Sequence, residues 1–102
     1  MAIANATLTD SAADIFTCSN AGGSAVVAII FHNTDSSAQT VTLHVCPGNE
    51  AQENENKILA VSVPAGESYV VNDKLLLSNT DTLTALAGTT SVVSATISYL
   101  DL

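Results

Sequence analysis

Short runs of apolar and alternating residues, separated by Gly, Asn, Asp and Ser, fill most of the 102-residue chain. Residues 25–33 are a continuous apolar run of strand length, as expected for a central strand. Alternation is strict over 40–46, with Val41, Leu43 and Val45 on one face and Thr42, His44 and Cys46 on the other. Such runs recur roughly every 8–12 residues, and no segment keeps a helical period. The pattern predicts an all-β protein, an antiparallel β-sandwich of about seven or eight strands, jelly-roll or immunoglobulin-like.

The turns between these runs predict how the strands pair. The connections after 25–33, after 57–63 and after 82–87 are short and polar, which favours three antiparallel hairpins with 40–46, 68–71 and 91–100. We expect one core, formed by the inward positions Val27, Ile29, Phe31, Val41, Leu43, Val45, Ile97 and Tyr99.

The length is that of a single domain. Residues 14–102 carry the strand pattern and are expected to form the sandwich. Residues 1–13 are weakly patterned, and we expect an N-terminal arm or edge strand there that orders on a neighbour. The polar loop 47–56 is long enough to reach across an interface. We therefore expect contacts with other proteins at the arm and at the loops.

The charge balance excludes several classes of partner. The chain has ten acidic residues, two lysines and no arginine, a net charge of −8. Nucleic acid binding needs clustered basic side chains, and anionic membranes repel this sign, so neither partner is expected. The first residues have neither the basic nor the apolar region of a signal peptide, and no run is long enough for a membrane span. We expect synthesis in a cytoplasm without export.

No arrangement of residues predicts a catalytic, cofactor or metal site. His32, His44 and Cys46 could form a metal cluster only with ligands that the sequence does not supply. We therefore expect both histidines to be ordinary surface or interface residues. Glu50, Glu53 and Glu55 do not follow the spacing of a calcium loop and fit a solvated loop. No serine has a nucleophile-elbow context, and no cysteine–histidine pairing can be argued. We expect no enzyme and no cofactor.

The cysteines and aromatic residues fit a structural interpretation. Cys18 and Cys46 are expected to be buried free thiols, because a chain made in the cytoplasm is kept reduced. The aromatic side chains are too few for a sugar-stacking surface and fit core anchors: Phe16, Phe31, Tyr69 and Tyr99.

Several turn-and-strand motifs together resemble small virion proteins of tailed bacteriophages. The motifs run from the apolar strand ending in Phe31-His32-Asn33-Thr34 to a terminal Ser98-Tyr99-Leu100 and cover most of the chain from about residue 25. Between them lie the strand 41–45, the turn 63–69 and the segment 75–83. The resemblance implies a structural role in the virion, as a capsid cement or decoration protein or as a tail, neck or fibre module.

We therefore expect a cement or decoration protein that binds the major capsid protein or another virion protein. Because it would bind only the assembled shell, it would stabilise the shell by mass action. We also expect a homo-oligomer, with a trimer favoured. The alternatives are a tail, neck or fibre module and, from another class, a carbohydrate-binding module.

Overall fold

A computed structural model describes residues 2–102, which form nine strands and two short 3₁₀ helices. In chain order these are β1 (Ala2–Thr7), β2 (Ala13–Thr17), β3 (Ser24–Asn33), β4 (Gln39–Cys46), η1 (Pro47–Asn49), η2 (Asn54–Asn56), β5 (Lys57–Val63), β6 (Ser68–Val71), β7 (Leu75–Leu77), β8 (Thr82–Ala87) and β9 (Val93–Asp101). The molecule measures 41 × 28 × 19 Å along its principal axes.

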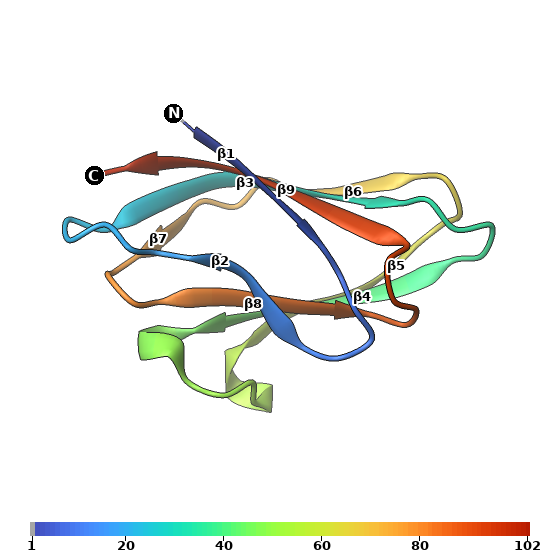
Figure 1. The fold of residues 1–102 in the computed structure, drawn as a ribbon, viewed down its shortest axis with the longest axis horizontal. Helices are drawn as coiled ribbons and strands as arrows, with labels where there is room; N and C mark the ends of the chain where they lie inside the picture. Colours follow the sequence, from blue (N-terminus) through green and yellow to red (C-terminus); the bar gives the residue numbers. More distant parts are fainter. Residues whose placement is uncertain (1) are drawn as a thin grey trace.

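The strands form two antiparallel sheets packed face to face (Figure 1). Sheet A has the order β1-β9-β3-β6, with β7 also paired to β3, and sheet B has the order β2-β8-β4-β5. β6 and β7 pair with different stretches of β3 and so share one position beside it. With that position counted once, the two orders are those of a jelly roll. The predicted all-β antiparallel sandwich is confirmed, and the jelly roll is the form it takes.

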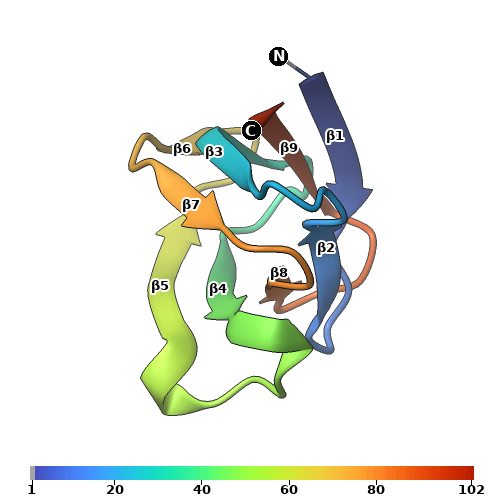
Figure 2. The same cartoon turned by 90° about the vertical axis from the view of Figure 1, so that its left-hand side faces the viewer.

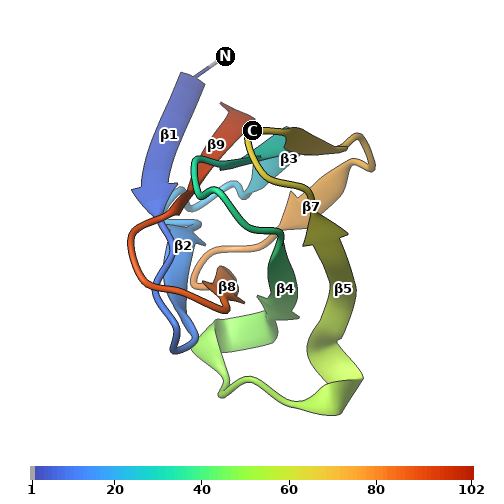
Figure 3. The same cartoon turned by 90° about the vertical axis from the view of Figure 1, so that its right-hand side faces the viewer.

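The three predicted hairpins are wrong. In each of them the first strand lies in one sheet and the second in the other: β3 and β4, β5 and β6, and β8 and β9 (Figures 2 and 3). Four or five connecting residues span about 13–17 Å when extended, which is enough to cross the roughly 10 Å between packed sheets. A short polar turn therefore fits an arch between sheets as well as a hairpin within one. Among consecutive strands, β4 and β5 do pair with each other.

A buried asparagine joins two of these arches. Asn33, at the end of β3, is fully buried, and its side-chain N–H groups donate to the carbonyl oxygens of Ser37 (2.9 Å) and Val63 (3.0 Å). Its side-chain oxygen accepts from the N–H of Asp35 at 2.9 Å. Both polar atoms of the Asn33 side chain thus have partners. This one side chain holds the β3–β4 and β5–β6 connections together.

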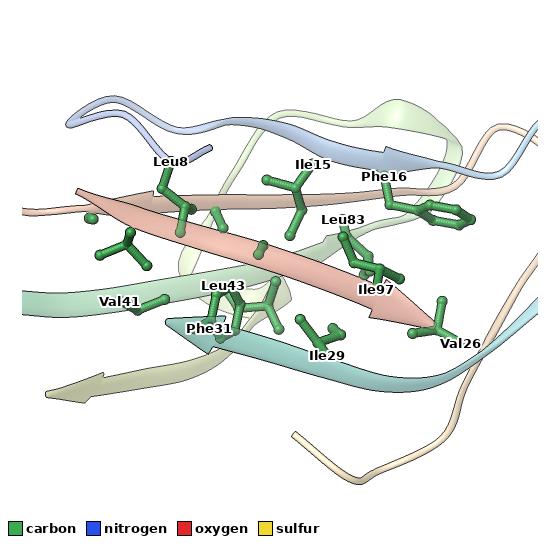
Figure 4. Packing of buried hydrophobic residues seen from close by; sticks show 14 of the residues in the cluster. Leu8, Ile15, Phe16, Val26, Ile29, Phe31, Val41, Leu43, Leu83 and Ile97 are labelled. Carbon is green, nitrogen blue, oxygen red and sulfur yellow. The ribbon is translucent and has the colours of Figure 1, made fainter. Parts of the chain in front are cut away.

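The core lies between the sheets (Figure 4). Of the eight residues predicted there, five are buried: Ile29, Phe31, Val41, Leu43 and Ile97. Val45 and Tyr99 are partly buried and pack against the core cluster. Val27 was predicted wrongly. The register of β3 against β9 shifts between Val26 and Ala28, so Val27 is a bulged residue and Val26 is the one fully buried. A bulge adds one residue and so reverses the alternation on which the prediction depended.

Candidate protein-binding surface

The outer face of sheet A is set by strand register. On β1 the alanines at 4 and 6 turn toward the core, so Ile3, Asn5 and Thr7 turn outward. Their partners on β9 are Ser98, Thr96 and Ser94. The same alternation continues across β3, β6 and β7, because successive residues of a strand point to opposite faces. The side chains that share this outer face are Ile3, Asn5, Thr7, Ala25, Ala28, Ile30, His32, Ser68, Val70, Leu76, Ser94, Thr96, Ser98 and Leu100.

None of these side chains is an acid, a lysine or an arginine. The charged residues lie in the turns at its rim, at the strand ends or on the side of sheet B. For a chain with a net charge of −8, a whole sheet face without charge is a marked asymmetry. We call these fourteen residues the neutral face.

The neutral face also exposes aliphatic side chains. Ile3 is 67% exposed and Leu76 is 75% exposed, and Ile30, Val70 and Leu100 are exposed as well. Register places Leu76 and Leu100 on either side of Ala25, and Val70 beside Ile30. In all three views no other segment of residues 2–102 covers this layer (Figures 1–3). Exposed aliphatic side chains that share one surface without charge are typical of protein-binding surfaces.

Sheet B presents a different outer face, because the chain folds back over it. The segment 47–56, with η1 and η2, lies against β8 and β4 on the side away from sheet A (Figure 1). The Gly48 N–H donates to the Asp81 carboxylate at 2.8 Å and ties the segment down. The side chains beneath it are polar or contain sulfur, and all are buried: His44, Cys46, Thr82 and Thr84.

His44 was predicted to be a surface or interface residue, and this is wrong. It is 6% exposed, and its Nδ1 is buried without a hydrogen-bond partner. Burial lowers the pKa of His44 below its usual value, and the positive charge of Lys57, its register partner on β5, lowers it further. The imidazole is therefore held in its neutral form. Alternation along β4 correctly turned His44 away from the core, but it could not show that a loop covers that face.

The possible metal ligands do not come together. His32 lies on the neutral face, where its Nδ1 is 2.8 Å from the Ser68 hydroxyl, whereas His44 lies on the outer side of sheet B. Over residues 2–102 no group of three or more His, Cys, Asp or Glu side chains is arranged to hold a metal ion.

The acidic loop keeps its three glutamates exposed. A hydrogen bond with the Glu55 side chain raises the pKa of Glu53, and partial desolvation and the nearby charge of Glu50 raise it further. The Glu53 carboxyl therefore keeps its proton to a higher pH than an isolated glutamate does.

Both cysteines are buried free thiols, as predicted. The Cys18 Sγ lies 3.4 Å from the Ser24 hydroxyl, at the end of the sandwich where β2 stops. The Cys46 Sγ lies 3.6 Å from the Thr84 hydroxyl, beneath the 47–56 segment. The two thiols thus pack in different parts of the molecule, Cys18 at one end of the sandwich and Cys46 on the outer side of sheet B.

The neutral face could not be found from the sequence alone. Its members come from five strands, and each strand contributes two to four of them, or one in the case of β7. The visible signal was apolar residues at positions that alternation turns outward, such as Ile3 and Ile30. Without the strand order, these residues could not be assigned to one surface.

Among the described residues no helix is long and apolar enough to cross a membrane. No family model and no curated protein matches this chain. The solved structures that share its fold include the following two. A chain from the acid-stable capsid of Helicobacter pylori bacteriophage KHP30 superposes with a TM-score of 0.61 at 9% identity, over 99% of this chain and 93% of that one. A chain from Bacillus endospore appendages, a family of disulfide-linked pili, superposes with a TM-score of 0.51 at 20% identity, over 99% of this chain and 84% of that one. At these identities the likeness is one of fold, a jelly roll also found in two protein assemblies.

Proposed function

We propose that this protein is a structural component of a tailed-phage virion, a cement or decoration protein that binds the shell through its neutral face. The role is non-enzymatic and the partner is the major capsid protein or another virion protein. The observation that carries the proposal is the absence of charge from the outer face of sheet A in a strongly acidic chain. The fold likeness to a phage capsid chain supports the setting.

The size of the neutral face suits such a contact. Four strand positions about 4.8 Å apart and strands of about nine residues cover roughly 19 × 30 Å, or about 600 Å². A standard protein–protein interface buries about 800 Å² on each partner, so this face and its rim provide an area of the right order. Its chemistry fits a partner surface of aliphatic and hydroxyl side chains, because a charged partner group would lose its water here without gaining an ion pair.

Shell stabilisation follows from selective binding. A protein that binds the assembled shell and not its free subunits shifts the assembly equilibrium toward the shell. The acidic loop on the opposite side faces solvent in this arrangement. The net negative charge keeps free copies apart before they bind.

The experiment uses a matched pair of substitutions. Thr96→Asp places a carboxylate in the middle of the neutral face, beside Ile30 and Asn5. Thr40→Asp places the same group at an exposed outward position of β4 in sheet B. Particles prepared without the protein are mixed with each variant, sedimented and assayed for bound protein. We expect Thr96→Asp to bind at least about tenfold more weakly, since a buried unpaired charge costs more than the ~1.4 kcal/mol of a tenfold change, and Thr40→Asp to bind normally.

The cement role is tested by shell survival. Particles carrying the protein should withstand higher temperature and stronger osmotic shock than particles without it. Equal survival would reject this role. Cryo-electron microscopy of the same particles distinguishes the alternative, a tail, neck or fibre module, which the likeness to an appendage pilin favours.

A carbohydrate-binding role has weaker support. Phe31 is fully buried, and Phe16 packs against Tyr99 with ring centroids 4.7 Å apart. Tyr69, at 36% exposure, is the aromatic ring most open to solvent, so no pair of rings forms a stacking platform.

A further inference from the structure

The four sheet edges of the jelly roll differ in how they are protected against pairing with another strand. Natural sheets protect their edges with charge, bulges or very short strands. In sheet B the edge strand β2 carries Asp14 and a register shift at Ile15, and the edge strand β5 carries Lys57 and a shift at Ile58. In sheet A one edge is divided between the short strands β6 and β7.

β1 has none of these protections. It is six residues long, uncharged, free of proline and in unbroken register with β9. No charged residue occurs in the sequence before Asp10. β1 pairs on one side only, and its other side faces away from the molecule (Figures 2 and 3). This edge is therefore open to strand addition.

The hydrogen bonds between β1 and β9 determine which backbone groups of β1 remain free at the edge. The N–H of Leu8 donates to the carbonyl of Val93, its opposite residue on β9, at 2.8 Å. Along an antiparallel pair, hydrogen-bonded positions alternate, so Ala6 and Ala4 also use their backbone groups toward β9. The backbone N–H and C=O groups of Ile3, Asn5 and Thr7 then point to the free edge.

We propose that the occupant of this edge is β1 of a second copy, paired antiparallel about a two-fold axis at Asn5. In that register Asn5 faces its own equivalent, and Ile3 faces Thr7 of the other copy. All six free backbone groups of each edge are used, and inward residues stay inward because the pairing keeps the period of two. A self-complementary edge suits a two-fold contact between identical chains.

The side chains also fit this register. Ala4 and Ala6 would face one another in the non-hydrogen-bonded positions, where opposite Cα atoms are closest, at about 4.5 Å, and small side chains are accommodated. Two copies of a chain with charge −8 can approach here because no charged side chain enters the paired stretch. The product is a continuous sheet with a neutral face from each copy. It is a dimer, in place of the trimer that the resemblance favours.

The test measures the mass of the free protein by sedimentation as a function of concentration. We expect a dimer that dissociates on dilution. Asn5→Pro removes the N–H at the two-fold axis without touching a backbone bond to β9, since proline is tolerated where an edge N–H faces solvent. It also removes the exposed bond that the Thr96 hydroxyl donates to the Asn5 side-chain oxygen at 3.2 Å, and Asn5→Ala, which loses the same bond, is the control for that loss. Asn5→Pro should raise the dimer dissociation constant at least about tenfold. Asn5→Ala keeps the N–H and should leave the dimer intact, as should Thr40→Asp.

A second variant covers the case in which Asn5→Pro does not fold. Asn5→Asp is isosteric and sets two carboxylates opposite each other at the axis, so it should also give monomers at neutral pH. A wild-type chain that is monomeric at about 0.1 mM, a trimer, or a dimer that both variants leave unchanged would overturn the proposal. The inference does not depend on the proposed shell contact, because binding to particles is read from Thr96→Asp and dimer formation from Asn5→Pro.

Discussion

Ile30 and Phe31 show how neighbouring residues of one strand serve two surfaces. Both lie on β3, in register with Thr96 and Ala95 of β9. Phe31 points between the sheets and is fully buried, whereas Ile30 points to the neutral face and is 38% exposed. Phe31 contributes to folding, and Ile30 belongs to the surface through which we propose that the protein binds its partner.

Phe31→Ala should lower the free energy of unfolding by about 3–5 kcal/mol, because it removes a large side chain from a close-packed core and leaves a cavity. Ile30→Ala is the matched control and should cost less than about 1 kcal/mol, since part of that side chain already contacts water. Urea denaturation followed by circular dichroism measures both. A loss for Phe31→Ala no larger than that for Ile30→Ala would show that Phe31 is not a core residue.

Residue-level alternation predicted the burial of most core positions, and its failure has a local cause. The inward positions of β3 after the bulge, Ile29 and Phe31, were predicted correctly. Val27 was not, because one bulged residue reverses the alternation and nothing in the run 25–30 marks where the extra residue falls. The adjacent buried residues Ile15 and Phe16 of β2 have the same origin, a register shift between Asp14 and Phe16.

At the scale of elements, the sequence predicted where strands run but not which sheet each one joins. The sheet that a strand joins depends on its pairing with strands far away in the sequence. A connection of four or five residues allows either a hairpin within one sheet or an arch between the two sheets. Asn33 is the one local sign of an arch. A buried polar side chain needs hydrogen-bond partners, and beside a turn the nearby backbone of the connections can supply them. Asn33 donates to the carbonyl oxygens of Ser37 and Val63 in this way.

The burial of His44 beneath the 47–56 segment makes stability depend on pH. The pKa of His44 is lower in the folded protein than in the unfolded chain, where it is about 6.5. Below that pH the unfolded state binds more protons than the folded state, so the free energy of unfolding falls as the pH falls from about 6.5 toward the folded pKa. Above pH 6.5 the contribution is fully present.

His44→Gln removes this titration and should flatten the dependence between pH 7.5 and 5, as measured by urea denaturation at several pH values. The pH slope of His44→Gln would equal that of the wild type if the buried imidazole were not the titrating group.

At the scale of the whole molecule, charge separates the two sides of the sandwich. The neutral face covers sheet A, whereas the exposed glutamates of the 47–56 segment lie beyond sheet B. Alternation alone indicated that outward positions existed, and composition alone indicated an excess of acid. Only the strand order shows that the two are segregated, and this segregation leaves the molecule with one uncharged side, through which we propose that it binds, and one acidic side.

The position of β9 has a consequence for how the chain acquires its structure. β9, which follows the other eight described strands in the chain, lies in the middle of sheet A, between β1 and β3. Sheet A therefore cannot close before β9 has been synthesised, and until then β1 lacks the strand with which it pairs. The pairing of β1 with β9 joins residues far apart in the sequence, from Ala2 with Tyr99 to Thr7 with Ser94. Topologies dominated by such non-local contacts fold slowly, on the order of milliseconds to seconds. Nascent chains stalled before Val93 should be digested by a protease that the released protein resists, and a resistant fragment ending there would mean that sheet B folds without β9.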